Sequence, residues 1–480
     1  MNRRDFLMIG FVLAASTLMS ADARSNHAVR VTAEYSMTVN GRPVNVRKAL
    51  NNTSKEVTDE YAFATFDCDG AARVRIVSDL DMSNTVIRPL SKRVGFTLID
   101  KHTIEFTAKT PFHYSVEPSG RQAVLEIFGN RPERDVPAQA TAGVIYFGPG
   151  DHYPGVIRPN DGQTVYLAEG AVVHGAIMIE GKRGVTIRGR GVLYGGDWEK
   201  FKGPAHYLFH ARRCRDLRVE GITLQASWCW TCVLSGCDGV TMENVKWCGG
   251  SILNDDSIDI VNSSGVTVRD CFIRGQDDLI AIKGSLGMDN KNCENILVER
   301  CVFFNDCANI CRYGYECAAK EFRNIVMRDC DIIHATPYPR DHKEYWANCC
   351  FFLQASGGLL IRDILFENIR IEDDRKGTIL LKAAAAKYST GIMNGEWVHD
   401  KAAKDDTDAG NIDGVVLRDI RVIGERAGES DQNITYLVGA DTAHTVRNVK
   451  FENVSGTGRV IVDNFADQPM ISPAPEKKGQ

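Results

Sequence analysis

Residues 266–271 read VTVRDC, residues 296–301 read ILVERC and residues 325–330 read IVMRDC. Each segment follows one six-residue pattern: apolar, any, apolar, any, a polar or small residue (often Asp or Asn), apolar. Self-similarity with a period of about 20 to 50 residues is typical of a solenoid. The pattern occurs at Val185–Arg190 (the weakest copy), Leu217–Ile222, Val240–Val245, Val266–Cys271, Ile296–Cys301, Ile325–Cys330, Ile364–Ile369, Val415–Ile420 and Val449–Val454.

The composition of these units favours a right-handed parallel β-helix over leucine-rich or helical repeats. The units are rich in Val, Ile, Thr and Phe, are flanked by Gly, Asn and Asp, and show little helical period. In a β-helix, equivalent positions of successive turns stack about 4.8 Å apart. We therefore expect Cys271, Cys301 and Cys330, preceded by Val245 and Ile222, to form one inward-facing stack. An interrupted β-sandwich is the alternative.

A different pattern precedes the repeats. From about residue 27 to 130, short runs with period-two alternation are separated by Gly, Pro, Asn and Asp clusters, which predicts an antiparallel β-sandwich. The polar stretch 131–142 is a plausible connector. The predicted fold class is all-β, with residues 1–24 a signal peptide, 25–140 the sandwich, 141–465 the β-helical catalytic domain and 466–480 a polar tail.

The N-terminal segment is typical of an exported protein. Arg3 and Arg4 precede an apolar run from Phe6 to Met19, and small residues follow at 21–23, which suggests a twin-arginine signal peptide; a membrane anchor is the alternative. After residue 24 no run reaches the ~18 to 20 apolar residues of a membrane span. We expect a periplasmic or extracellular protein with no membrane span in its mature form.

Net charge and cysteine usage exclude other classes. The formal net charge is −5 over 480 residues, and no basic stripe appears, which argues against nucleic acid as a partner. Cys229 and Cys232 form a lone C-x-x-C without a second pair at zinc spacing. We expect no cofactor and no metal, whereas the sequence leaves open whether any of the 15 cysteines form disulfides, and likewise the oligomeric state.

The strongest chemical signal is the segment 254–283, in which NDDSIDI (254–260) and QDDLIAIK (276–283) each place paired aspartates beside apolar strand residues. Asp256 and Asp277 are 21 residues apart, close to one turn of a β-helix, so their carboxylates should lie on neighbouring turns. Like charges this close repel, so one carboxyl group should hold its proton above the ordinary aspartate pKa of about 3.9. A carboxyl group with a raised pKa beside ionised carboxylates suits glycosidic cleavage, because one group can donate a proton to the leaving oxygen while another activates water or attacks the anomeric carbon. A calcium site and solvated turn aspartates are the alternatives.

These motifs resemble those of known glycoside hydrolases. Residues 254–259 resemble the Asn-Thr-Asp-Gly-x-Asp motif of polygalacturonase-type hydrolases, and residues 276–282 are similar to their Gln-Asp-Asp-Cys-x-Ala-x motif. The resemblance implies Asp277 as general acid, with Asp256 and Asp278 holding the hydrolytic water. It also implies inversion of configuration, with carboxylates roughly 6.5 to 9.5 Å apart.

The chain departs from that family at two later motifs. Where the family has Gly-His-Gly, residues 310–315 read ICRYGY, and its Arg-Ile-Lys corresponds at best to Leu380-Leu381-Lys382. The sister family of dextranases and isopullulanases is more similar overall. It joins an N-terminal sandwich to a right-handed β-helix and has an aromatic-Gly-aromatic segment where Tyr313-Gly314-Tyr315 stands here.

Substrate contacts follow from residue type. Aromatic rings pack against the apolar faces of sugars, and cations could bind an anionic sugar or neutralise the aspartates. The candidate substrate-binding residues are Asn254, Asp259, Lys283, Arg312, Tyr313, Tyr315, Trp346 and Lys382.

The sequence therefore predicts an exported inverting glycoside hydrolase of an α-linked polysaccharide, similar to dextranases. Two alternatives remain: a polygalacturonase-like hydrolase of uronic-acid polysaccharides, and a non-catalytic carbohydrate-binding β-helix. A polysaccharide lyase on the same scaffold is a lesser one. Sugar identity, linkage and endo or exo action are not indicated.

Overall fold

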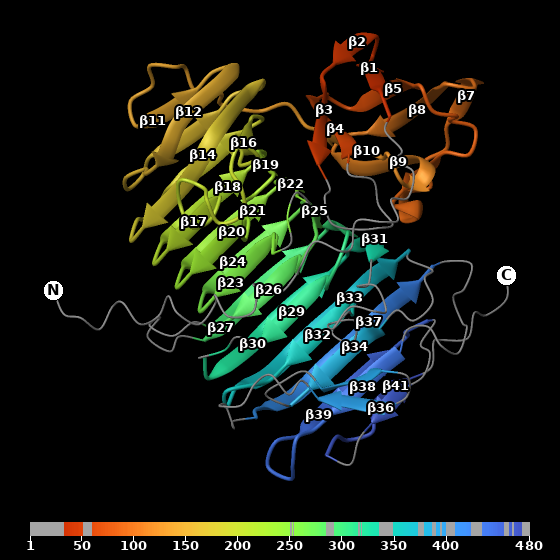
Figure 1. Cartoon of the computed structure of the whole chain (residues 1–480), viewed down its shortest axis with the longest axis vertical. Helices are drawn as coiled ribbons and strands as arrows, with labels where there is room; N and C mark the ends of the chain where they lie inside the picture. Colours follow the sequence, from red (N-terminus) through yellow and green to blue (C-terminus); the bar gives the residue numbers. More distant parts are fainter. Residues whose placement is uncertain are drawn as a thin grey trace.

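The chain folds into an N-terminal β-sandwich beside a long parallel β-helix (Figure 1). The computed structural model describes residues 33–50, 60–249, 252, 254–284, 292–314, 317, 319–335, 349–372, 379–385, 390–393, 396–399, 409–423, 434–455, 460–462 and 465–472. The predicted signal peptide and most of the predicted C-terminal tail lie outside these residues. In the described part of the chain, no helix has the length and apolar character needed to cross a bilayer.

Two five-stranded sheets form the sandwich. Apolar residues that alternate along the strands, such as Val74 and Ile76 from one sheet and Val116 and Ile127 from the other, are buried between them. All pairings are antiparallel except β4 with β10, which is parallel. The first sheet is ordered β2 (Arg42–Val44), β1 (Tyr35–Val39), β5 (Ala71–Ser78), β8 (Thr103–Lys109) and β7 (Thr97–Asp100); the second β3 (Val46–Leu50), β4 (Glu60–Asp67), β10 (Leu125–Asn130), β9 (Phe112–Arg121) and β6 (Val86–Arg88), with the short helix η1 (Leu90–Lys92) after β6.

The β-helix has three faces, each a stack of parallel strands, as predicted. The first face contains β11 (Val144–Phe147), β13 (Thr164–Leu167), β15 (Thr186–Gly189), β18 (Arg215–Glu220), β21 (Asp238–Glu243), β24 (Ser264–Arg269), β27 (Cys293–Glu299), β30 (Glu321–Arg328), β33 (Leu360–Ile371), β37 (Asn411–Val422), β39 (Val446–Glu452) and β41 (Met470–Ser472). The second contains β12 (Gly150–Ile157), β14 (Ala171–Glu180), β16 (Val192–Tyr194), β19 (Thr223–Gln225), β22 (Lys246–Cys248), β25 (Phe272–Gly275), β28 (Val302–Asn305) and β31 (Asp331–Ala335).

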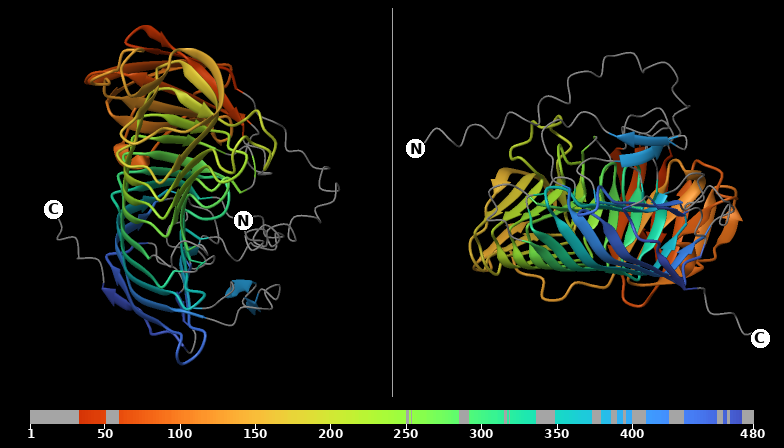
Figure 2. Two further views of the ribbon diagram at one scale, coloured as in Figure 1. Left: turned by 90° about the vertical axis from the view of Figure 1, so that its left-hand side faces the viewer. Right: turned by 90° about the horizontal axis from the view of Figure 1, so that it is seen from below.

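The third face carries the candidate site. Its strands are the ends of β12 and β14, then β17 (Phe209–Arg212), β20 (Cys232–Ser235), β23 (Ile258–Val261), β26 (Ile280–Lys283), β29 (Cys311–Gly314), β32 (Phe351–Gln354), β34 (Ile379–Ala384), β38 (Ile434–Val438) and β40 (Val460–Val462). A hairpin of β35 (Thr390–Met393) and β36 (Glu396–His399) stands off from the stacked strands (Figure 2). It lies between β34 and β37, a stretch of the chain much of which lies outside the described residues.

The six-residue pattern marks the corner between the first and second faces. Its first four residues belong to a first-face strand, as Val266–Arg269 do in β24, and its fifth residue adopts the left-handed backbone conformation. Asn and Asp tolerate that conformation better than most residues, and Gly adopts it freely. All nine copies show it: Gly189, Gly221, Asn244, Asp270, Arg300, Asp329, Asn368, Asp419 and Asn453.

The sixth residue of the pattern returns to the core. Cys271, Cys301 and Cys330 are at most 1% exposed and lie in the apolar cluster that fills the β-helix. This confirms the predicted inward stack. All cysteines fall within the described residues, and no disulfide joins any two of them.

The outer face of the second sandwich sheet packs against the second face of the β-helix. Tyr61, Phe63 and Phe128 from the sandwich meet Phe272 and Phe304 from the β-helix. Because this apolar contact is continuous, the sandwich supports the turns that lead from the second face to the third, where the aspartates lie.

Candidate active site

The aspartates lie where the chain passes from the second face to the third. Asp256 precedes β23, and Asp277 and Asp278 precede β26. The two strands pair with Ile258 opposite Ile280, and the Ser257 amide donates to the Asp278 carbonyl oxygen at 3.0 Å. Asp256 is therefore level with Asp278 and Asp255 with Asp277, one residue away from the 21-residue alignment expected from the sequence.

The three predicted catalytic carboxyl groups converge. One oxygen from each of Asp256, Asp277 and Asp278 lies within 4.8 Å of the others. Burial, and then the charges of Asp256 and Asp278, raise the pKa of Asp277 well above its ordinary value. The Asp278 amide donates to Asp277 Oδ1 at 3.0 Å. The separation of roughly 6.5 to 9.5 Å implied by the family resemblance is therefore wrong for these oxygens, which are closer.

Lys283 forms an ion pair with one member of this cluster, Asp256. It ends β26, and its Nζ lies 2.8 Å from Asp256 Oδ2 and 2.9 Å from Asp259 Oδ1. The ammonium also lies 3.6 Å from the centroid of the Trp230 ring, a cation–π contact. Asp259 is completely buried. Neither Asp259 nor Lys283 is placed as the sequence suggested for substrate contact; both orient Asp256.

The side-chain amide of Asn309 orients Asp278, as Lys283 orients Asp256. Asn309 Nδ2 donates to Asp278 Oδ1 at 2.7 Å, and Asn309 Oδ1 accepts from the Cys349 amide at 2.8 Å. The buried Asn309 thus has a fixed orientation, and its side-chain amide orients the Asp278 carboxyl group. Sequence analysis missed Asn309; its only signal is its position one turn after Asp278.

The neighbouring acid has a structural role. Asp255 is 1% exposed, and its Oδ1 accepts from the Gln276 amide at 2.7 Å. It therefore ties the turn that carries Asp256 to the turn that carries Asp277, and only one aspartate of the 255–256 pair joins the catalytic cluster.

A second cation approaches from a loop that the sequence did not single out. Lys200 Nζ donates to Asn254 Oδ1 at 2.6 Å, and Asn254 Nδ2 lies 3.5 Å from Asp277 Oδ2. Burial lowers the pKa of Lys200, while Asp277 is the first of several carboxyl groups that oppose this shift. Asn254, one of the predicted substrate-binding residues, thus connects Lys200 to Asp277, the carboxyl group whose pKa is raised.

The remaining predicted contacts are largely buried. Tyr313 is wrong as a cleft residue: its side chain is fully buried and stacks on Phe366 in the apolar core, because it points inward from β29. Lys382 is also fully buried, and burial lowers its pKa to about 7. Arg312, 8% exposed, lies over the Phe352 ring at 4.0 Å. Tyr315 and Trp346 lie outside the described residues.

The sandwich supports the aspartate turns from behind. Arg274 is fully buried, with ion pairs to Glu126 of the sandwich at 3.2 Å and to Asp306 at 2.8 Å. Asn305, next to Asp306, donates to the Asp277 carbonyl oxygen at 3.2 Å. The backbone of the turn that carries Asp277 is therefore connected to the sandwich through buried polar contacts.

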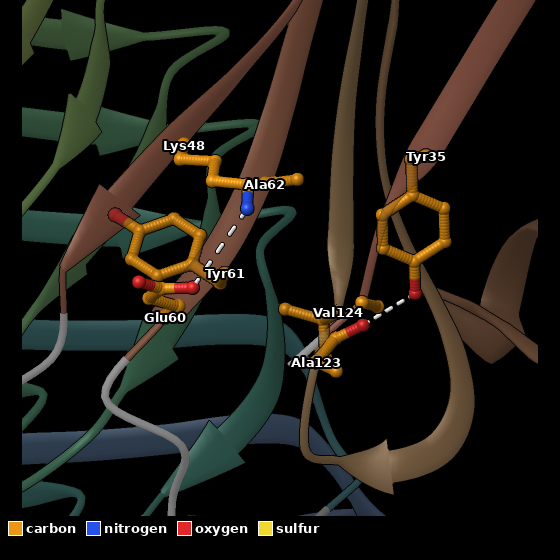
Figure 3. A pocket seen from close by; sticks show the side chains of 8 residues that line it. Tyr35, Lys48, Glu60, Tyr61, Ala62, Ala123 and Val124 are labelled. Carbon is orange, nitrogen blue, oxygen red and sulfur yellow. Dashed lines mark hydrogen bonds and ion pairs between the residues drawn. The ribbon is translucent and has the colours of Figure 1, made fainter. Parts of the chain in front are cut away.

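A small crevice in the sandwich offers no comparable chemistry (Figure 3). Its lining includes Tyr35, Lys48 and Tyr61, and the Tyr35 hydroxyl donates to the Ala123 carbonyl oxygen. The Tyr61 hydroxyl instead donates to the Gly249 carbonyl oxygen at 2.9 Å, in the turn after β22. This crevice contributes to the contact between the two parts of the molecule.

The aspartate cluster also has the ligand type that hard cations prefer. Calcium takes about six to eight oxygen ligands, and the three aspartates offer oxygens within 4.8 Å of one another. The Lys283 ammonium already neutralises Asp256 at 2.8 Å. The arrangement therefore fits a protonated acid and an ion pair better than a divalent cation.

Fold and site together define a glycoside hydrolase: a parallel β-helix with a carboxyl group of raised pKa beside two carboxyl groups oriented by hydrogen bonds. The model of the glycosyl hydrolases family 28 matches residues 169–458, and the chain belongs to that family. A probable polygalacturonase of Arabidopsis thaliana is 31% identical over 146 residues, which cover 25% of this chain and 32% of that protein. The match thus spans about a third of the relative's length.

One solved structure shows the same fold, and another is similar in part. Dex49A from Penicillium minioluteum superposes with a TM-score of 0.64 at 14% identity and covers 93% of this chain and 96% of its own. An exopolygalacturonase from Thermotoga maritima has a TM-score of 0.48 at 14% identity, with 68% of this chain and 83% of its own covered. The first likeness extends over the sandwich as well as the β-helix.

Proposed function

We propose that this protein hydrolyses an α-linked polysaccharide with inversion of configuration, with Asp277 as general acid and with Asp256 and Asp278 holding the attacking water. The observation that carries the proposal is the asymmetry within the cluster. Asp277 has a raised pKa, whereas Asp256 accepts from Lys283 and Asp278 accepts from Asn309. One group is thus suited to donate a proton and two are suited to accept one.

The spacing supports a shared water. A hydrogen bond to a carboxylate oxygen is about 2.8 Å long, and the oxygens of Asp256 and Asp278 are at most 4.8 Å apart. One water can therefore contact both oxygens at once, with an angle at the water of at most about 120°. When it attacks the anomeric carbon, its proton passes to one of these carboxylates, and Asp277 protonates the leaving oxygen.

The environment of the cations supports a neutral sugar. Lys283 is bound to two carboxylates, Arg312 stacks on Phe352 and its Nη2 lies 3.2 Å from Gln354 Oε1, and Lys382 is fully buried. Each cation thus takes part in contacts within the protein.

A uronic-acid polysaccharide is the second candidate. Arg312 and Lys382 both lie over the Phe352 ring, at 4.0 and 4.7 Å from its centroid, so two basic side chains share one place on the third face. A carboxylate at this place would be attracted by both. The partial match to a probable polygalacturonase points the same way.

Reducing-sugar release from dextran, pullulan and polygalacturonate, measured side by side, tests the proposal. We expect release from a neutral α-glucan and its loss in Asp277→Asn. Release only from polygalacturonate would replace the first substrate class by the second, and a folded protein inert on a broad glycan panel would favour a non-catalytic carbohydrate-binding protein. Proton NMR of the first anomer formed distinguishes inversion from retention.

We also propose that the chain is exported by the twin-arginine route. Arg3-Arg4 followed by an apolar run supports this route. A polymeric substrate, which is found outside the cell, supports export. Export should be lost when both arginines are replaced by lysine, as measured by cell fractionation; unchanged export would exclude this route.

A further inference from the structure

A column of equivalent positions on successive turns of the third face extends from Asp256 toward the N-terminal end of the β-helix. The third-face strands pair with Phe209 opposite Cys232 and Cys232 opposite Ile258. The Thr231 amide donates to the Asp256 carbonyl oxygen at 2.8 Å, and the Phe209 amide donates to the Thr231 carbonyl oxygen at 2.9 Å. This register makes Tyr207, Trp230 and Asp256 equivalent positions on three successive turns.

The two aromatic positions of this column form a stacked pair. The rings of Tyr207 and Trp230 are 5.6 Å apart between centroids, with an interplanar angle of 3°, and both side chains are partly exposed. Trp230 also contacts the Lys283 ammonium, which binds Asp256. The aromatic pair therefore begins beside the catalytic cluster and leads away from it by about one 4.8 Å step per turn.

The loop that carries Tyr207, residues 195–208 between β16 and β17, is firmly attached to the core. Trp228 is fully buried, and its Nε1 donates to the Ala205 carbonyl oxygen at 2.9 Å. The Phe201 amide donates to the Trp228 carbonyl oxygen at 2.8 Å. The loop thus has a defined position, which a binding surface requires.

The same loop presents a third aromatic ring, that of Phe201, beside the Lys200 ammonium. Phe201 is 57% exposed, and Lys200 Nζ lies 5.0 Å from the centroid of its ring. Lys200 contacts Asn254, which lies against Asp277. Phe201 is thus connected to Asp277 through Lys200 and Asn254, and its exposed ring is available to a sugar chain that passes the aspartates.

We propose that Tyr207, Trp230 and Phe201 form a binding subsite for pyranose units of the substrate chain on the N-terminal side of the aspartates. The apolar C–H faces of the sugar rings pack against the aromatic rings, which provide contact area at little cost in side-chain entropy. This inference rests on the proposed function and adds to it: the subsite recognises sugar rings by their apolar faces, and it binds chains long enough to extend past Asp256.

Tyr207→Ala and Phe201→Ala test the subsite, with Tyr153→Ala as a matched control. Tyr153 is 72% exposed and stacks on His174 at 4.4 Å, on strand β12 away from the aspartates. Steady-state kinetics are measured on the polysaccharide of the dextran, pullulan and polygalacturonate panel that the wild type cleaves best. The same variants are assayed on a nitrophenyl glycoside of the same sugar, which is too short to reach Tyr207.

We expect KM for the polysaccharide to rise about tenfold in Tyr207→Ala, with a smaller rise in Phe201→Ala and kcat within about twofold. Cleavage of the nitrophenyl glycoside and the kinetics of Tyr153→Ala should be unchanged. An unchanged KM in both variants, or an equal loss on the long and short substrates, overturns the subsite. Phe201 is largely exposed, so this variant serves even if Tyr207→Ala does not fold.

A failure of the proposed function is distinguishable from a failure of the subsite. If the wild type cleaves no member of the panel, the hydrolysis proposal fails for these substrates. Binding of oligosaccharides from the same three polymers is then measured by saturation-transfer NMR in an Asp277→Asn background. Binding that is lost with Tyr207→Ala supports the subsite, and absence of binding or binding indifferent to both changes overturns it.

Discussion

Replacing Lys283 by methionine separates the proposed role of this residue from simple packing. Its Nζ lies 2.8 Å from Asp256 Oδ2 and 2.9 Å from Asp259 Oδ1, and all three side chains are at most 9% exposed. At an effective dielectric constant of about 20, each pair contributes roughly 6 kcal/mol of attraction. The cost of removing the charges from water offsets most of this sum, so truncation of the cation should lower the free energy of unfolding by about 3 to 5 kcal/mol.

The catalytic effect has two parts. Without the ammonium, Asp256 more readily holds a proton and can no longer accept one from water, so kcat should fall by at least about 100-fold. Lys283 also counteracts the raised pKa of Asp277. In the molecules whose Asp256 stays ionised, which carry the residual activity, the loss of Lys283 raises that pKa further, so the alkaline limit of the residual activity should move to higher pH.

Urea denaturation and a pH profile of kcat/KM measure these effects. Lys202→Met is the matched control, because Lys202 is 70% exposed and pairs only with Glu199 among the described contacts; we expect a change below about 1 kcal/mol. In a Lys283→Met background, Asp259→Asn should restore part of the stability by removing a buried charge that has lost its ion pair with Lys283. Wild-type stability and a kcat within twofold of wild type in Lys283→Met would refute the reasoning.

Three further results are expected. Asp277→Asn should lower kcat by about 10² to 10⁴-fold, and wild-type activity should fall as pH rises through the raised pKa of Asp277. Because the folded state holds this proton and the unfolded state loses it near the ordinary aspartate pKa of about 3.9, wild-type stability falls as pH rises from that value toward the raised pKa, and this part of the decline should be absent from Asp277→Asn. Burial raises the pKa of Glu126 from 4.5 to about 8. As pH rises between these values, Glu126→Gln should therefore gain stability relative to wild type by up to about 1.4 kcal/mol per pH unit. A difference in the free energy of unfolding that does not change with pH would contradict this. Excess EDTA should leave activity intact with no ultraviolet-absorbing unsaturated product, whereas calcium dependence with such a product would indicate a lyase.

The amino-acid sequence was sufficient to predict the β-helix, because the pattern that produces it is local. Apolar residues at alternate positions fill the core, and a residue that tolerates the left-handed conformation turns the corner at Asn244, Asp270 and their equivalents. The catalytic aspartates were predictable for a related reason. Residues one coil apart in the chain become neighbours, so paired aspartates about one turn apart had to converge.

The rest of the site depends on contacts between segments distant in sequence, which only the tertiary structure decides. Lys200 reaches Asn254 over 54 residues and Asn309 reaches Asp278 over 31, and no local pattern marks either residue. Whether a strand residue points inward or outward also depends on register. The sequence analysis placed Tyr313 in the cleft, but in the register of β29 its side chain points into the core. Local periodicity thus determined the coil and its acidic turns, whereas the stacking of the turns determined which carboxyl group keeps its proton, because that depends on burial and on charges from other turns.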